Sequence, residues 1–168
     1  MFGHKVKAQG QFSYQLYRKG EFIQAGHFKN GITVEGINHL LDIGFDSGTQ
    51  KTSWYVSISD DMTTDNISED DTNDVHTWTE NTDYDETLRR EIQFNAASAK
   101  IISTGTTYAE LTINDTMTIS GLFVSSESTK GGTSGSEILW SAGVITNGLA
   151  VEDDDVLKIS YSLTVQNS

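Results

Sequence analysis

The segment Asp60–Glu86 holds the densest group of side chains that could do chemistry. It contains eleven carboxylates and no lysine or arginine. Carboxylate oxygens at alternating positions are ligands for Ca²⁺, so a divalent-cation site is the first function to consider. An EF-hand loop requires a D-x-[DN]-x-[DN]-G pattern and a distal glutamate, and neither run of acids supplies that spacing or the glycine. We therefore interpret the segment as a solvated acidic loop, with Asp70, Asp71 and Asp74 as first candidates should a cation bind.

A cluster of ring-bearing and charged side chains lies within and just after this segment. Its members are His76, Trp78, Glu80, Tyr84, Arg89 and Arg90. A His–Glu pair can transfer protons, but no serine-nucleophile motif, phosphate loop or paired-histidine metal spacing accompanies it, so the sequence indicates neither an enzyme nor a cofactor. A buried tryptophan and an arginine paired with a carboxylate can instead fasten a loop to the protein body. We predict that the cluster is a structural clasp.

A second long loop is expected at Ser125–Ser136, which is rich in serine, threonine and glycine and lies between two apolar segments. A phosphate-binding loop requires the lysine after the glycines, whereas Lys130 precedes them here. The glycines could let the backbone approach a partner closely, or could simply form a mobile tip. Lys130 is therefore a candidate for contact with a partner.

Charge is distributed unevenly along the chain. Residues 1–30 form a basic arm and hairpin with five basic residues and one acid, a net charge of +4, so the other 138 residues carry −17 of the total of −13. This acidic body repels nucleic acid and anionic membranes, and we expect neither as a partner. The basic patch could contact an acidic protein surface or remain solvated. The candidate partner-binding residues are Lys5, Lys7, Arg18, Lys19 and Lys130.

Short alternating segments dominate the chain and predict an all-β fold. Phe12, Tyr14 and Leu16 share one face of a strand, and a turn at Arg18-Lys19-Gly20 leads into a return strand. Further strands are expected at Trp54–Ser59, Glu91–Asn95, Lys100–Thr104, Tyr108–Asn114, Thr116–Ser125, Ser136–Trp140 and Val156–Val165. About nine strands without repeated βα units predict a two-sheet β-sandwich, with the jelly roll as one candidate topology. We expect residues 1–168 to form one domain that includes the N-terminal hairpin.

One short amphipathic helix is expected at about residues 33–45. Thr33 is a suitable N-cap, and Gly44 or Gly48 could end the helix. Four residues with helical spacing form an apolar stripe that we expect to face the sandwich: Ile37, Leu40, Leu41 and Phe45. His39 lies off that stripe, so we expect it to face solvent.

The sequence contains no cysteine and no proline. Disulfides and cysteine-based metal sites are therefore excluded. Edge strands cannot be protected by proline, and we expect them to be covered by pairing with another subunit. No apolar run is long enough to span a bilayer and the first residues lack a secretory pattern, so we expect synthesis in a cytoplasm.

Two motifs in the long loops carry a family resemblance. The stretch Asp71-Thr72-Asn73-Asp74-Val75-His76-Thr77-Trp78-Thr79-Glu80, continued by Tyr84 and Arg89-Arg90, resembles a "DT…H…WTE…Y…R" pattern of small tailed-phage structural proteins, among them capsid decoration (cement) proteins. The loop Lys130–Gly135 resembles a "TKGGT(S/T)G" loop of the same family. Shorter matches occur at Gly36-Ile37-Asn38, Trp54-Tyr55-Val56 and Ile119–Phe123. Asn73-Asp74-Val75 and Thr77 depart from the small-residue run and the Gly-Trp of the family, and residues 1–30 have no counterpart.

The resemblance implies a non-enzymatic virion protein, made in the host cytoplasm, that binds the outer surface of the assembled head. Its partner would be the major capsid protein, and a homodimer or homotrimer would suit a symmetric shell. A tail or head-fibre module that binds a host-surface glycan is the alternative. In that case Trp54, Trp78, Trp140 or the tyrosines would stack on sugar rings beside acidic groups.

Overall fold

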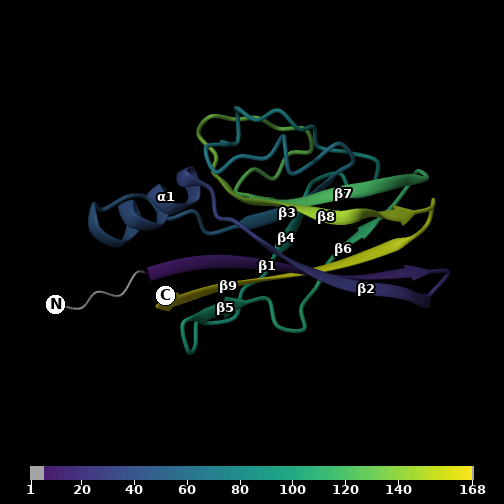
Figure 1. The fold of residues 1–168 in the computed structure, drawn as a ribbon, viewed down its shortest axis with the longest axis horizontal. Helices are drawn as coiled ribbons and strands as arrows, with labels where there is room; N and C mark the ends of the chain where they lie inside the picture. Colours follow the sequence, from purple (N-terminus) through teal and green to yellow (C-terminus); the bar gives the residue numbers. More distant parts are fainter. Residues whose placement is uncertain (1–5, 168) are drawn as a thin grey trace.

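The computed structural model describes the backbone of residues 6–167 and contains two antiparallel sheets and one helix (Figure 1). Strands make up 48% of the chain and helix 8%, so the predicted all-β two-sheet sandwich is confirmed. The elements in chain order are β1 (Val6–Arg18), β2 (Glu21–Asn30), α1 (Val34–Phe45), β3 (Trp54–Ser59), β4 (Arg90–Ile92), β5 (Ile101–Ser103), β6 (Ala109–Thr112), β7 (Met117–Ser125), β8 (Leu139–Val151) and β9 (Val156–Asn167).

The chain fills the two sheets with consecutive pairs of strands. The larger sheet has the order β2-β1-β9-β5, with β6 also paired to β9, and the smaller sheet has the order β4-β3-β7-β8. Two strands thus join one sheet before the chain crosses to the other. A jelly roll instead sends most successive strands to alternate sheets, so its strand order is not the one found here.

The core lies between the sheets and comes from the predicted alternation. Leu157, Ile159, Tyr161 and Leu163 of β9 point inward and are buried, while their neighbours in the strand are half-exposed. Facing strands of the smaller sheet contribute fully buried Ile58, Leu122 and Val124, among others. The N-terminal hairpin turns at Lys19 and Gly20 with φ of 51° and 80°, a pair of positive values typical of a two-residue hairpin turn.

Strand β8 extends further than the sequence indicated. Its first residues match the predicted strand at Ser136–Trp140, but it continues to Val151. Small residues at Ser141-Ala142-Gly143 and a turn-like Asn147-Gly148 pair hide the alternation. Both residues of that pair have positive φ, and the register with β7 is irregular beside them.

The helix covers one end of the sandwich, as Figure 1 shows, but with a different side than expected. Thr33 is the predicted N-cap, because its hydroxyl accepts a hydrogen bond from the Gly36 amide at 3.0 Å. Gly36 is the buried residue of the helix, and a side chain there would meet the Trp140 carbonyl oxygen at 2.9 Å. The glycine thus permits close packing against β8.

The predicted apolar stripe is therefore not the buried face. Of its four residues Ile37 is half-buried, whereas Leu40, Leu41 and Phe45 are 41%, 49% and 89% exposed. His39, expected in solvent, is half-buried instead. Glycine carries no apolar signal in a periodicity analysis, and this explains the error. No helix among residues 6–167 is long and apolar enough to cross a bilayer.

Candidate functional site

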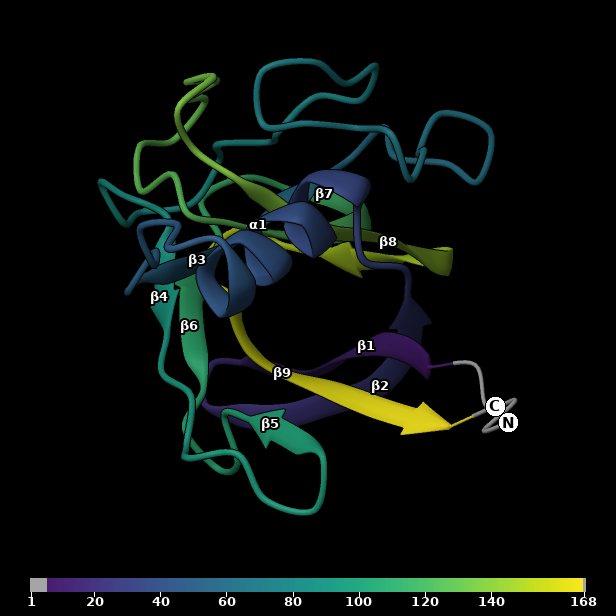
Figure 2. The ribbon, with the colours of Figure 1, turned by 90° about the vertical axis from the view of Figure 1, so that its left-hand side faces the viewer.

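The two long loops predicted from the sequence lie together over the smaller sheet. The loop of residues 126–138 and most of the loop of residues 60–89 are on the side of that sheet away from the larger sheet (Figures 1 and 2). Residues 83–86 instead bond to the end of β6 in the larger sheet. A backbone hydrogen bond joins the two loops directly, from the Arg89 amide to the Ser128 carbonyl at 2.9 Å. We call this pair of segments the loop layer.

A buried ion pair holds the loop layer together. The Arg89 guanidinium donates to both carboxylate oxygens of Glu80, with a shortest distance of 2.7 Å, and the two side chains are 3% and 5% exposed. Arg89 also donates to the carbonyls of Glu127 and Gly132 at 3.1 and 3.0 Å. The Gly131 amide donates to Glu80 at 2.6 Å. Each charge therefore has several partners, as a buried pair requires.

Lys130 is part of the same arrangement. Its ammonium donates to the carbonyls of Tyr84 and Glu86 at 2.6 and 2.9 Å and lies 3.9 Å from the centre of the Tyr84 ring. Burial raises the pKa of the Tyr84 hydroxyl well above its usual range. The lysine that the sequence offered for partner binding thus fastens one loop to the other.

Trp78 anchors the acidic half of the loop layer. Its ring is 3% exposed, packs on Phe123 and stacks on His76 at 3.9 Å. The indole N–H donates to Asp71 at 3.0 Å, and His76 Nδ1 lies 2.7 Å from the Trp78 carbonyl. The structure therefore brings five of the six predicted clasp residues together: His76, Trp78, Glu80, Tyr84 and Arg89. Arg90 is exposed in β4 and is not part of this group.

The three acids considered for a metal have separate roles. Asp71 is 7% exposed and accepts hydrogen bonds from Trp78 and from the Ser68 amide. Asp74 accepts from the Thr72 hydroxyl at 2.8 Å, and Asp70 is exposed. Among the described residues, no three histidine or acidic side chains gather into a group that could hold a metal ion.

The predicted basic patch is divided by the structure. Arg18 pairs with Asp155 and Glu152 at 2.8 and 2.6 Å, and its hydrogen bonds hold the pKa of Asp155 below the usual range. Lys19 is exposed at the hairpin turn and Lys7 is exposed near the start of β1. Lys5 lies outside the described residues.

Sequence reasoning missed a broad polar surface on the larger sheet. The outward positions of β1, β2 and β9 alternate with buried ones and carry mostly serine, threonine and glutamine. We call this surface the polar face; its residues are Lys7, Gln9, Gln11, Ser13, Gln15, Ala25, His27, Lys29, Lys158, Ser160, Ser162, Thr164 and Gln166. None of these residues is acidic. The strand alternation that predicts the buried apolar positions also locates these residues, because they lie between those positions and point to the opposite side of the sheet.

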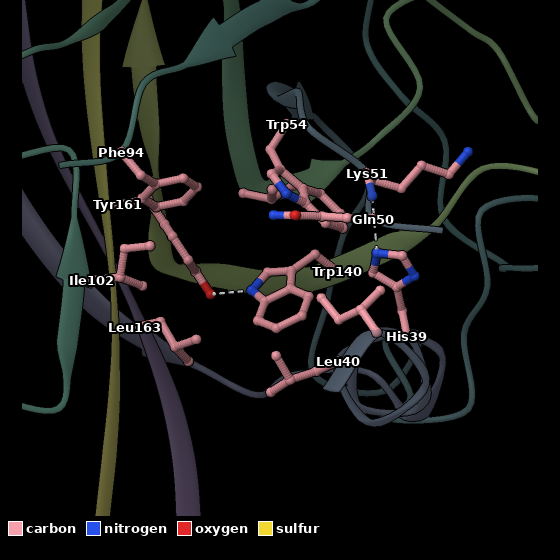
Figure 3. Close-up of a pocket in the computed structure, with 12 residues that line it drawn as sticks. His39, Leu40, Gln50, Lys51, Trp54, Phe94, Ile102, Trp140, Tyr161 and Leu163 are labelled. Atoms are coloured by element: carbon pink, nitrogen blue, oxygen red, sulfur yellow. Dashed lines mark hydrogen bonds between the residues drawn. The ribbon is translucent and has the colours of Figure 1, made fainter. Parts of the chain in front are cut away.

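An aromatic pocket of about 200 Å³ opens where α1 meets the two sheets. Figure 3 shows Phe94, Tyr161, Trp54 and Trp140 on its walls, with His39 and Leu40 entering from the helix. The Trp140 indole donates to the Tyr161 hydroxyl at 3.2 Å. The lining is mainly apolar and holds no paired acid and base. The pocket can accept a small apolar group, and its walls indicate no reaction.

The tryptophans proposed as sugar platforms are largely covered. Trp78 and Trp140 are 3% and 8% exposed, and Trp54 is half-buried in the pocket wall.

A scan against models of protein families found no match for the chain. A search of curated proteins found no similar sequence either.

Proposed function

We propose that the chain is a non-enzymatic structural protein of a tailed-phage virion that binds the outside of the assembled head. In this role it is a decoration, or cement, protein that contacts the major capsid protein and stabilises the shell. The observation that most supports this proposal is the division of charge between two opposite sides of the sandwich. One side is the polar face, where Glu110 of the neighbouring strand β6 is paired with Lys158, and the other is the loop layer, which carries most of the acids.

The polar face has the properties of a docking surface. The five strands of the larger sheet contain four basic and two acidic residues: Lys7, Arg18, Lys29 and Lys158 against Glu21 and Glu110. Glu110 is already paired with Lys158 at 2.8 Å. A broad surface without free carboxylates can approach a large polar partner without the repulsion that a chain of net charge −13 creates elsewhere.

Binding stabilises the shell by mass action. A protein that binds the assembled shell and not its free subunits shifts the equilibrium toward assembly by its binding free energy. Many copies on a symmetric shell, each bridging neighbouring subunits, multiply a modest affinity at each site. The acidic loop layer then faces solvent and keeps decorated particles apart.

Co-sedimentation with empty heads of the encoding phage tests the proposal. We expect the chain to pellet with heads at micromolar concentration and to raise the temperature at which they disrupt. The double variant Q11E/S162E places two acids on the polar face and should lower head binding at least tenfold. The control variant Thr63→Glu adds an acid to the exposed loop layer and should bind normally. Absence of binding to heads, with binding to isolated tails instead, would overturn the proposal.

The glycan-binding alternative has one observation in its favour. A shallow depression of about 280 Å³ lies in the polar face itself, and its lining includes Gln15, His27, Tyr108 and the serines Ser13 and Ser160. Hydroxyl, amide and ring groups of this kind bind sugars. A glycan array separates the two functions, because a decoration protein gives no reproducible hit and an adhesin does.

A further inference from the structure

Strand β2 is the least protected edge of the described sheets. Strands β4, β5 and β6 are three or four residues long, and the long edge strand β8 is distorted at Asn147 and Gly148. Short length and local distortion both prevent pairing with other chains. In contrast β2 has ten residues, no proline and a single lysine, and lies at the margin of the larger sheet (Figure 1).

The free side of β2 offers unpaired backbone hydrogen-bonding groups. Within residues 6–167, no backbone hydrogen bond joins residues 21–29 to a segment other than β1. An edge strand leaves alternate N–H and C=O groups unpaired along its length. An extended strand from another chain satisfies these groups.

We propose that β2 pairs with β2 of a second copy of this chain, antiparallel and around a two-fold axis. The two larger sheets then join into one continuous sheet. The strand carries one acid and one base, Glu21 and Lys29, so two copies meet without net repulsion. Most other surfaces of a chain with net charge −13 repel each other. Two identical strands also match in length, and two-fold dimers are the commonest closed assembly.

The fold fixes the register of this pairing. Ile23 has no partner in β1, where the register shifts, so the regular part of β2 is Gln24–Asn30 and its midpoint is His27. A two-fold axis at His27 places Gly26 opposite Phe28 of the partner subunit on the inner face, small against large. It also places Ala25 opposite Lys29 of the partner subunit on the polar face.

Cysteine cross-linking tests both the pairing and its register, because the chain has no cysteine of its own. In His27→Cys the two sulfurs meet at the axis, and mild oxidation should give a disulfide-linked dimer. In the matched variant Ala25→Cys the two Cα atoms lie roughly 13 Å apart, beyond the reach of a disulfide. Both positions are exposed, so neither change disturbs the fold. Cross-linking of Ala25→Cys alone, or of neither variant, overturns the proposal.

Charge substitutions provide a test without cross-linking. Ala25→Lys opposes Lys29 of the partner subunit at two symmetric points and should raise the dimer dissociation constant roughly tenfold in sedimentation velocity. The double variant A25K/K29E restores opposite charges and should return the constant to the wild-type value. A wild-type chain that sediments as an 18.5 kDa monomer at all concentrations, or as a trimer, overturns the proposal. The measurement uses no phage heads, so its outcome is independent of head binding.

Discussion

The loop layer and the polar face use charged side chains in opposite ways. In the loop layer, Glu80 and Arg89 are buried and bind each other and the surrounding backbone. On the polar face, Lys7 and Lys29 are exposed. The cluster with the strongest chemical appearance in the sequence therefore maintains structure. The polar face, which is rich in serine and glutamine, is the surface that we propose binds a partner.

This difference shows why residue types alone do not locate a binding surface. A histidine, a glutamate and an arginine within a short stretch resemble an acid–base site. Here the glutamate and the arginine have their hydrogen-bonding groups occupied by the loops themselves, and Nδ1 of the histidine lies against the Trp78 carbonyl. Groups that bind a partner must be unoccupied in the free protein. Stability should therefore depend on the loop layer and docking on the polar face.

Removal of Glu80 should have the largest effect on stability. Glu80→Ala leaves the Arg89 guanidinium buried without its carboxylate, and we expect the free energy of unfolding to fall by about 3–5 kcal/mol. Urea denaturation measures this loss. The exposed acid Asp65 provides the control, since Asp65→Asn should change stability by about 0.5 kcal/mol or less. A loss below about 1 kcal/mol for Glu80→Ala would show that the ion pair does not hold the loops.

Trp78→Phe should have a smaller effect in the same layer. It removes the donor that binds the largely buried Asp71 and keeps most of the ring packing. Asp71 keeps its hydrogen bond from the Ser68 amide. A hydrogen bond to a charged group contributes about 1.5–3 kcal/mol, and thermal unfolding should report the loss of the one from Trp78. Val75→Ala is the matched control, because Val75 is 68% exposed. Equal stability of the two variants would contradict the role given to the Asp71 hydrogen bond.

The sequence predicted the elements well where alternation or capping was clear. The strand at Trp54–Ser59 and the helix with Thr33 as its N-cap match the structure. The sequence did not predict which side of the helix is buried. Gly36 has no side chain, so it packs closely against Trp140 and selects the buried side of the helix. The role of Lys130 was also hidden, since its carbonyl partners are 44 and 46 residues away in the chain.

Acid should weaken the loop layer through specific carboxylates. Burial alone would raise the pKa of Asp61, but hydrogen bonds from Thr79 and Ser59 outweigh it and hold the pKa below its usual range. A carboxylate whose pKa is lower in the folded state stabilises the fold at pH values above its unfolded-state pKa of about 3.9. This stabilisation is lost as the pH falls through the folded-state pKa. Asp155, paired with Arg18, contributes in the same direction.

Glu35 acts in the opposite direction, because burial raises its pKa and protonation in acid favours the folded state. We expect a net loss of stability below about pH 4, measured by urea denaturation across a pH series. Asp61→Asn should reduce the loss between pH 5 and pH 3. An unchanged slope in that variant would remove Asp61 from the explanation.

Substitution on the polar face should have the smallest effect on stability. Gln11 and Ser162 are opposite each other on β1 and β9 and make no side-chain hydrogen bond among the described residues. The free energy of unfolding of the Q11E/S162E variant should lie within about 1 kcal/mol of the wild-type value, because a surface substitution rarely changes it by more than about 0.5 kcal/mol. A much larger loss would mean that the face is structural, and head binding by this variant would then be uninformative.

Electron cryo-microscopy of empty heads incubated with the chain tests the central claim most directly. We predict extra density on the outer surface of the shell, with the larger sheet toward the capsid and the loop layer toward solvent. Undecorated heads, or density with the loop layer against the capsid, would contradict the account.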